Sequence, residues 1–413
     1  MQNVINLLLL LYISLFNVQA QNQKLEFYIS QGFKNSPLLQ DYQNQINSAS
    51  VDSLLVRAGQ KPQADVNAQL MYAPVFSKFG YDDALTNGGI YSSVFSVSQS
   101  FLNRQVLNNK FEGLKTQKKS QTNKRKVSEN DLRRTITNQY LTSYADFSDL
   151  SFNESFLKLI MEEKELLKSM VEHGVYKQTD FLSLLIETQT QEILVLQLNT
   201  QFKKDVRLLN EICGITDTAK YVLTLPEISE NEPISLAQSP LLLQYKIDSL
   251  NIVNDRWTVN LRYNAKFKWF ADAGLMSSTP QGLSNHLGFS AGVNFSIPIY
   301  DGHQRKYEIQ KLDIQEDTRG SYQRFFITQY DQQLKQLNEE INSVRQLKQQ
   351  LKKQAGTATE LITMAKSQLN IGNMPITEFI NAIKNYLGIN HNLNQAQIRE
   401  FQLINEINYL MQK

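Results

Sequence analysis

The segment Leu287–Ile297 reads LGFSAGVNFSI, and every second residue in it is apolar. The apolar positions, continued by two residues, are Leu287, Phe289, Ala291, Val293, Phe295, Ile297 and Ile299. Glycine, serine and asparagine stand between the apolar residues from Leu287 to Ile297, and Pro298 precedes Ile299. A period of two residues is that of a β-strand, because successive side chains point to opposite faces of a sheet. We therefore predict a strand over about residues 286–300, with one apolar and one polar face.

The same alternation occurs in three other segments, which predict strands over about residues 62–78, 89–102 and 257–276. In the last of these, Trp257 and Trp269 fall on the apolar face, and Arg262, Lys266 and Lys268 fall on the opposite face. The predicted strands are about 12 to 19 residues long, whereas strands of globular proteins usually have about 5 to 6. A soluble β-sandwich explains the alternation but not this length.

Membrane strands explain both properties. Trp257 and Trp269 would lie about 28 Å apart along the membrane normal, at about 3.3 Å per residue and a tilt near 45°. That is the spacing of two aromatic girdles at a bilayer. Arg262, Lys266 and Lys268 would then face the lumen and favour anionic solutes. Four strands cannot close a membrane barrel, which needs about eight, and lipid does not tolerate open edges. Several chains must therefore share one barrel, and three chains would supply twelve strands.

Very long helices accompany the strands. Residues 104–173 contain no proline and one glycine, Gly113. About 70 helical residues would extend about 105 Å, too far for a compact domain. Residues 303–371 form a similar segment with apolar residues at heptad-like spacing, which is typical of a coiled-coil strut. We predict two helical hairpins, over about residues 104–213 and 303–411.

The chain also repeats itself after about 200 residues. Gly174, followed by Thr179-Asp180-Phe181-Leu182, returns as Gly372, followed by Thr377-Glu378-Phe379-Ile380. Asn35-Ser36-Pro37-Leu38-Leu39 returns as Gln238-Ser239-Pro240-Leu241-Leu242. These matches predict an internal tandem repeat, with one copy over residues 21–216 and the other over 238–413. Residues 217–237 would be an equatorial linker between them.

The first 20 residues resemble a secretory signal peptide. An apolar run from Asn6 to Val18 ends in Val18-Gln19-Ala20, which predicts cleavage after Ala20. An uncleaved anchor is the alternative. No later stretch of about 20 residues is apolar enough for a transmembrane helix.

The composition argues against several functions. Lys and Arg number 42 and Asp and Glu 40, and they are interspersed, so nucleic acid is not an expected partner. One cysteine, Cys213, excludes a disulfide framework, and its place before Gly214 predicts a buried thiol at a helix end. Four histidines without ligand spacing predict no metal site, and no nucleophile–base set or phosphate loop predicts an enzyme or a cofactor.

Taken in order, these motifs resemble the TolC family of outer-membrane efflux proteins. The features that carry the resemblance are the Asn-Ser-Pro near the mature start, the paired strands, Pro298-Ile299-Tyr300-Asp301-Gly302 before the second long helix, and the two glycine turns. The resemblance implies a homotrimer with a twelve-stranded β-barrel in the outer membrane of a Gram-negative bacterium. A long α-helical barrel would continue from it into the periplasm, as an α+β membrane protein. It also implies a periplasmic adaptor (membrane fusion protein), an inner-membrane pump and outer-membrane lipid as partners.

The resemblance further places the tunnel gate at the two glycine turns. Thr179, Asp180, Thr377 and Glu378 match positions that gate the tunnel or bind cations, whereas Asn381 stands where a second acidic ring would be. Three Glu378 carboxylates near a threefold axis would repel one another and attract cations. The alternative is structural, with Thr179 and Thr377 capping the following helices and Asp180 and Glu378 in their first turns.

Two functions remain open on the sequence. The first is an outer-membrane exit duct for multidrug efflux or type I secretion, which passively conducts small molecules or proteins. The second is a periplasmic coiled-coil adaptor or scaffold. The second accounts for the helices but not for the long alternating strands.

Overall fold

The computed structural model describes residues 22–74, 76, 79–82, 88–216, 222–230 and 236–411. The predicted signal peptide lies outside these residues, as do parts of the predicted 62–78 strand and of the 217–237 linker. The described chain combines long helices with a four-stranded sheet, as predicted. It divides into two compact units, each built from both halves of the sequence. The division into two tandem repeats stays a prediction.

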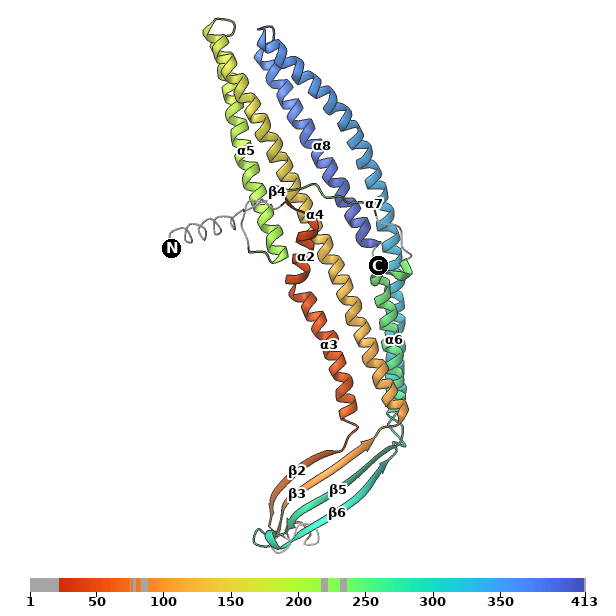
Figure 1. The fold of residues 1–413 in the computed structure, drawn as a ribbon. Coiled ribbons are helices and arrows are strands. Elements are labelled where there is room, and N and C mark those ends of the chain that lie inside the picture. Colours follow the sequence, from red (N-terminus) through yellow and green to blue (C-terminus); the bar gives the residue numbers. More distant parts are fainter. Residues whose placement is uncertain are drawn as a thin grey trace, which may run out of the picture. The chain divides into compact units, whose positions relative to one another are not determined.

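The first unit, residues 41–125 and 241–325, is called the sheet unit here. Its strands are β2 (Gln63–Ala73), β3 (Gly88–Phe101), β5 (Lys266–Ser277) and β6 (Leu287–Ser296). They lie in the order β2-β3-β5-β6, and all neighbours are antiparallel (Figure 1). Strands β2 and β6 are therefore the two edges of the sheet.

The register keeps like side chains together across the sheet. One row pairs Val66, Phe95, Ala273 and Phe289, and the adjacent row pairs Asp65, Ser96, Asp272 and Ser290. Because neighbouring rows face opposite sides, one face is apolar and the other polar. The alternation predicted from the sequence is thus present in three dimensions.

Strand β5 begins at Lys266, so the prediction that this strand starts at Trp257 is wrong. Residues 257–261 continue helix α6 (Pro240–Leu261). The neighbouring strand β3 ends with the pair Phe101–Phe267, and helix α4 (Arg104–Glu172) begins shortly after it. A strand extended back to Trp257 would have no hydrogen-bonding neighbour there, whereas a helix satisfies its own backbone groups.

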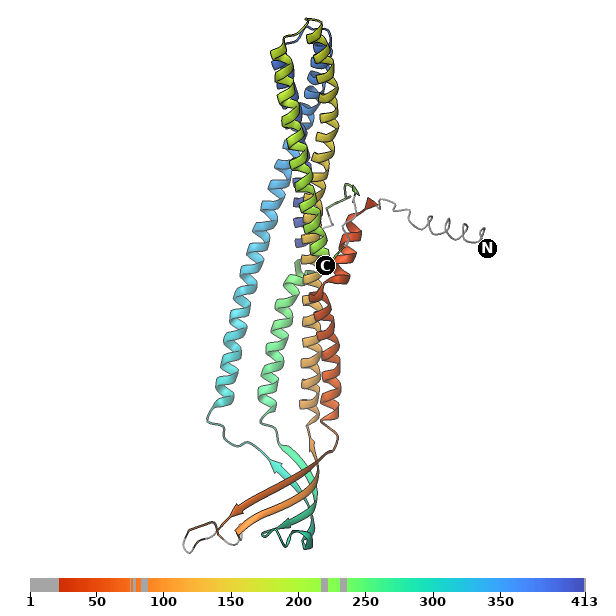
Figure 2. The ribbon, with the colours of Figure 1, turned by 90° about the vertical axis from the view of Figure 1, so that its left-hand side faces the viewer.

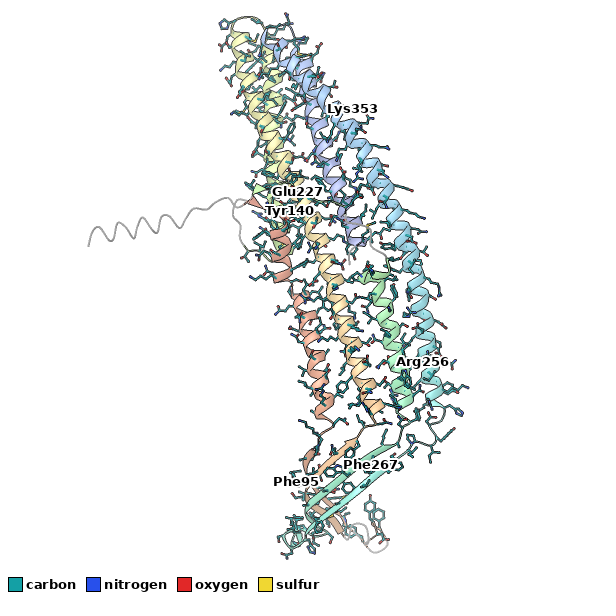
Figure 3. The ribbon with its side chains drawn as sticks, turned by 45° about the vertical axis from the view of Figure 1, so that its right-hand side comes forward. Phe95, Tyr140, Glu227, Arg256, Phe267 and Lys353 are labelled. Atoms are coloured by element: carbon teal, nitrogen blue, oxygen red, sulfur yellow. The ribbon has the colours of Figure 1, made fainter. Side chains whose placement is uncertain are left out.

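Four helical segments complete the sheet unit: most of α3 (Pro37–Ala58), the start of α4, α6, and the start of α7 (Gln304–Asn370). Polar and ring contacts join neighbouring helices. The Arg57 guanidinium lies 5.7 Å from the centre of the Phe111 ring, joining α3 to α4. The Asn109 amide donates to the Thr258 hydroxyl over 2.8 Å, joining α4 to α6. Arg256 pairs with Asp313 and joins α6 to α7 (Arg256 is labelled in Figure 3).

The second unit, residues 1–40, 126–240 and 326–413, is called the helical unit. It contains α2 (Leu25–Asn35), α5 (Gln178–Cys213), α8 (Ile376–Leu410) and the later parts of α4 and α7. A short parallel pair, β1 (Asn22–Gln23) with β4 (Val222–Leu223), belongs to it as well. In both ribbon views α4 and α5 run side by side to their connecting turn (Figures 1 and 2).

Apolar side chains fill the interior of the helical unit. Tyr28 of α2 packs with Tyr140 of α4 and with Leu209 and Cys213 of α5, and all four are buried (Figure 3 labels Tyr140). Burial raises the pKa of the Cys213 thiol to about 12, which confirms the predicted buried thiol. Helix α2 was not predicted. Within the described residues, no helix combines the length and apolar character that a membrane span requires.

Candidate functional site

The two glycine turns lie against each other in the helical unit. Gly174 and Gly372 have φ angles of 75° and 78°, a left-handed conformation that favours glycine. A Cβ atom on Gly372 would come within 2.8 Å of Val175 Cγ1, so the second turn leaves no room for a side chain there. The structure therefore brings together the two turns that the repeat predicted, and we call this region the tip.

Tyr176 links the two turns at the tip. Its hydroxyl lies 2.9 Å from the Met374 carbonyl oxygen and 3.2 Å from that of Leu369, and it donates to these acceptors. Burial raises the pKa of Tyr176, so the hydroxyl keeps its proton for this contact at neutral pH. Sequence reasoning missed Tyr176, because its partners are nearly 200 residues away in the chain.

Thr179 and Thr377 are not N-caps, contrary to the structural role predicted for them. Helices α5 and α8 begin at Gln178 and Ile376, so their caps are Lys177 and Pro375. Each threonine is therefore the second helical residue, past the position from which a side chain caps. Both threonines are exposed.

Asp180 and Glu378 occupy equivalent positions but differ in their contacts. The Asp180 carboxylate accepts a hydrogen bond of 3.0 Å from the Lys177 backbone N–H, as in a capping box. Glu378 is exposed, and no described residue pairs with its carboxylate. Asn381, one turn further along α8, is exposed as well. Asp180 therefore stabilises its own helix, whereas the Glu378 carboxylate is available to an ion or to another copy.

Two ion pairs join the helical hairpins near the tip. Glu163 of α4, whose side chain is 4% exposed, pairs with Lys366 of α7 over 2.8 Å. Glu187 of α5 pairs with Lys384 of α8 over 3.1 Å. Neither pair has a sequence signal, because residues on different helices meet only through the fold. Together with Tyr176 they hold the two turns in one rigid group.

Because β5 begins at Lys266, one residue of the predicted aromatic girdle and one of the predicted basic face lie outside the strand. Trp257 lies on α6, so it cannot form a girdle on the same strand as Trp269, and that prediction is wrong. Trp269 lies on β5, where its indole N–H donates to the Gln99 side chain over 3.2 Å. Arg262 also lies outside the strand, in the turn after α6, and pairs with Glu308 over 3.0 Å.

Lys266 and Lys268 do lie on β5, at its first and third positions. Lys266 pairs in register with Ser296, and Lys268 with Ser100 and Asn294, so both belong to the polar face. Both lysines are exposed. No group of three His, Cys, Asp or Glu side chains among the described residues is placed to hold a metal ion.

No protein-family model and no curated protein matches this sequence. Solved structures match its fold over 94% of the chain. A membrane protein from Pseudomonas aeruginosa has 12% identity and a TM-score of 0.73, with 90% of that chain covered. The outer-membrane protein VceC from Vibrio cholerae has 11% identity and a TM-score of 0.72, with 95% covered. The Campylobacter jejuni CmeC outer-membrane channel has 11% identity and a TM-score of 0.73, with 85% covered. The resemblance drawn from the sequence is thereby confirmed at the level of the fold: this chain has the fold of the TolC-type outer-membrane channels.

Proposed function

We propose that this protein is the outer-membrane exit duct of a tripartite efflux pump or a type I secretion system. One observation carries the proposal: the four-stranded sheet has an exposed apolar face and two open edges. In water such a sheet would expose large apolar side chains and unpaired backbone groups, which promotes aggregation. In a bilayer, lipid covers the apolar face and other copies cover the edges.

The exposure of individual side chains supports the membrane assignment. Phe289 is 91% exposed, Leu70 79% and Val66 70%, although all three are large and apolar. They alternate with polar residues that would face a water-filled lumen, as in membrane β-barrels. A single exposed large apolar side chain needs no explanation, but a whole sheet face of exposed apolar side chains does.

The sheet topology supports a closed ring of copies. Because each strand runs antiparallel to its neighbour, β2 and β6 run in opposite directions. Strand β6 of one copy can therefore pair in antiparallel fashion with β2 of the next, a head-to-tail contact that closes by rotation. Two copies would give eight strands, about the number whose interior is filled by side chains. Three copies give twelve strands and leave room for a lumen, so we infer a homotrimer.

The partners follow from the same proposal. A duct whose helices extend into the periplasm needs a periplasmic adaptor and an inner-membrane pump to supply its cargo, and the protein itself conducts passively. The fold alone does not select small molecules over secreted proteins as cargo. The competing function, a periplasmic coiled-coil adaptor or scaffold, accounts for the helices but leaves the apolar sheet face without a use.

Fractionation of a Gram-negative host that expresses the full chain tests the proposal. We expect the protein in the outer membrane, as a detergent-resistant trimer that migrates more slowly before heating than the dissociated monomer does after it. A soluble monomer in the periplasm would contradict the assignment. Deletion of the gene, followed by a panel of toxic compounds and an assay of secreted proteins, then separates efflux from secretion.

A further inference from the structure

A pocket of about 480 Å³ lies in the sheet unit, where α4 begins, α6 ends and β5 begins. Its apolar lining includes Leu102, Val106, Leu261 and Phe267 (Phe267 is labelled in Figure 3). The Phe267 ring packs against that of Phe101, with centroids 5.6 Å apart, and both rings belong to the apolar row of the sheet, so they border the pocket from the face of β5 opposite to Lys266 and Lys268. The volume is within the range of about 300–1,000 Å³ typical of small-molecule sites.

Positive charge borders this apolar lining. Lys110, Lys266 and Lys268 line the pocket, and no described residue forms an ion pair with any of them. Arg262 is a fourth lining cation, but Glu308 neutralises it. No aspartate or glutamate is part of the lining. The pocket thus combines an apolar interior with three uncompensated cations.

Three of the four strands contribute to the site. The central strands β3 and β5 supply Phe101, Phe267 and both strand lysines, and the edge strand β6 supplies Asn294 and Ser296, whereas the edge strand β2 contributes nothing. The Asn294 side chain adds a neutral polar group beside Lys268, its register partner. Pairing of copies along the edges would therefore leave the lysines and the apolar wall in place.

We infer that this pocket binds a small amphipathic molecule with one anionic head group. The lysine ammonium groups pair with the head group, and the apolar lining takes up the hydrocarbon part. A neutral amphiphile lacks the first interaction, and a small inorganic anion lacks the second. The site is complete within one copy, so it goes beyond the proposed transport function and does not depend on it.

Equilibrium binding of decanoate to the full-length protein tests the inference. The purified protein is held in phosphatidylcholine nanodiscs if it fractionates with membranes and in buffer if it is soluble, and empty discs or buffer alone serve as the blank. We expect saturable binding of decanoate, weaker binding of decanol, and no measurable binding of acetate. Added salt should weaken the binding of decanoate, because the lysines are exposed.

Variants then assign the binding to this pocket. The pair Lys266→Gln and Lys268→Gln should weaken decanoate binding about tenfold, from two exposed ion pairs of up to about 1 kcal/mol each. Lys266→Arg with Lys268→Arg should retain it. Lys352→Gln with Lys353→Gln, which removes two exposed lysines of the helical unit, is the matched control and should change nothing. Val106→Phe should weaken decanoate and decanol alike by filling the pocket.

Two results overturn the inference: equal decanoate affinity in the Lys266/Lys268 glutamine variant, or equal affinity for decanol and decanoate in the unaltered protein. The trimer and fractionation assays are separate measurements. Failure of either proposal therefore leaves the other standing.

Discussion

The helical unit buries clusters of its apolar side chains, whereas the sheet unit exposes large apolar side chains. Within the described residues, all four clusters of buried apolar side chains belong to the helical unit. In the sheet unit, Val66, Leu70, Leu287 and Phe289 are each at least 70% exposed. The helical unit therefore has a core of its own, whereas the sheet unit leaves its apolar surface uncovered within one copy.

The two units also differ in whether their charged side chains have partners. In the helical unit, the buried Asp149 carboxylate accepts from the Asn394 amide over 2.6 Å and lies 2.9 Å from His391 Nδ1. The buried Glu163 has Lys366 as its partner. In the sheet unit, Lys266 and Lys268 have no ionic partner among the described residues. These buried carboxylates of the helical unit have partners within it, whereas the two lysines of the sheet unit are presented to the surroundings.

The largest effect is expected from removal of a core ring in the helical unit. Phe379 is fully buried among Leu184, Leu369 and Ile383, and Phe379→Ala should lower the free energy of unfolding by about 3–5 kcal/mol. Denaturant titration followed by hydrogen exchange in α5 and α8 measures this loss. The effect should be the same in detergent and in lipid.

Ile186, which is 63% exposed on α5, provides the control for Phe379. Ile186→Ala should change the unfolding free energy by less than about 0.5 kcal/mol in the dissociated chain. A loss as large as that of Phe379→Ala would show that the helical unit has no separate core, and the comparison of the two units would fail.

A charge on the apolar sheet face tests the sheet unit. Phe95 is 49% exposed and lies in the apolar row, and Ser96 beside it lies in the polar row (Figure 3 labels Phe95). Phe95→Lys should destabilise the membrane-inserted form by about 2–4 kcal/mol, because it places an ammonium group in lipid. Ser96→Lys should have little effect, because its side chain would face the lumen.

The amount of heat-modifiable protein in outer-membrane fractions measures both variants. In water the expectation reverses, since replacing an exposed phenylalanine by lysine improves solubility. Equal yields of the two variants would therefore argue for a sheet that faces water on both sides.

The helical unit contains one carboxyl group that its interior does not fully satisfy. Burial, together with the neighbouring carboxylates of Asp205 and Asp149, raises the pKa of Asp146 to about 8. The folded state then binds a proton that the unfolded state releases near pH 4, so stability is highest at low pH and falls as the pH rises toward 8. The slope is at most about 1.4 kcal/mol per pH unit for one proton.

Asp146→Asn should remove this slope and stabilise the protein at pH 9 by up to about 5 kcal/mol, with little change at pH 4. Denaturant midpoints across this pH range measure the effect. Asp331→Asn, at an exposed position of α7, controls for the loss of one negative charge. An unchanged slope in Asp146→Asn would locate the pH dependence at another group.

The sequence predicted the features that depend on local pattern. Alternation over Leu287–Ile297 identified a strand because a period of two is a property of neighbouring residues alone. The long helices were predictable because proline is absent from them. The turns were predictable because their left-handed backbone favours glycine.

Features that depend on distant partners were not predictable. Residues 257–261 alternate as a strand would, but the Asn109–Thr258 hydrogen bond and the end of β3 keep them helical. Helix α2 is different, because its buried residues Leu25, Tyr28, Ile29 and Gly32 recur at helical spacing, a local signal that the sequence analysis missed. Near the tip, Tyr176 and the Glu163–Lys366 pair join positions about 200 residues apart, which no local signal reports.

The smallest effects are expected at the tip, where the helical unit itself presents an unpaired group. Asp180→Ala should cost about 0.5–1 kcal/mol, because it removes the acceptor for the Lys177 N–H. Glu378→Ala should cost about 0.3 kcal/mol, since only the helix dipole favours that exposed carboxylate. Hydrogen exchange in the first turns of α5 and α8 measures the two losses of stability separately.

The effects of these two positions on channel block should be in the reverse order, larger at Glu378 than at Asp180. Glu378→Gln should reduce the block of single-channel current by divalent cations, because three such carboxylates in a trimer would form one anionic ring. Asp180→Asn should leave the block unchanged, because that carboxylate already accepts from its own helix. If Glu378→Gln leaves the block unchanged while Asp180→Asn relieves it, the exposed Glu378 carboxylate is not the group that binds the blocking cation. If neither variant changes the block, the two turns differ in stability only, and neither carboxylate binds the blocking cation.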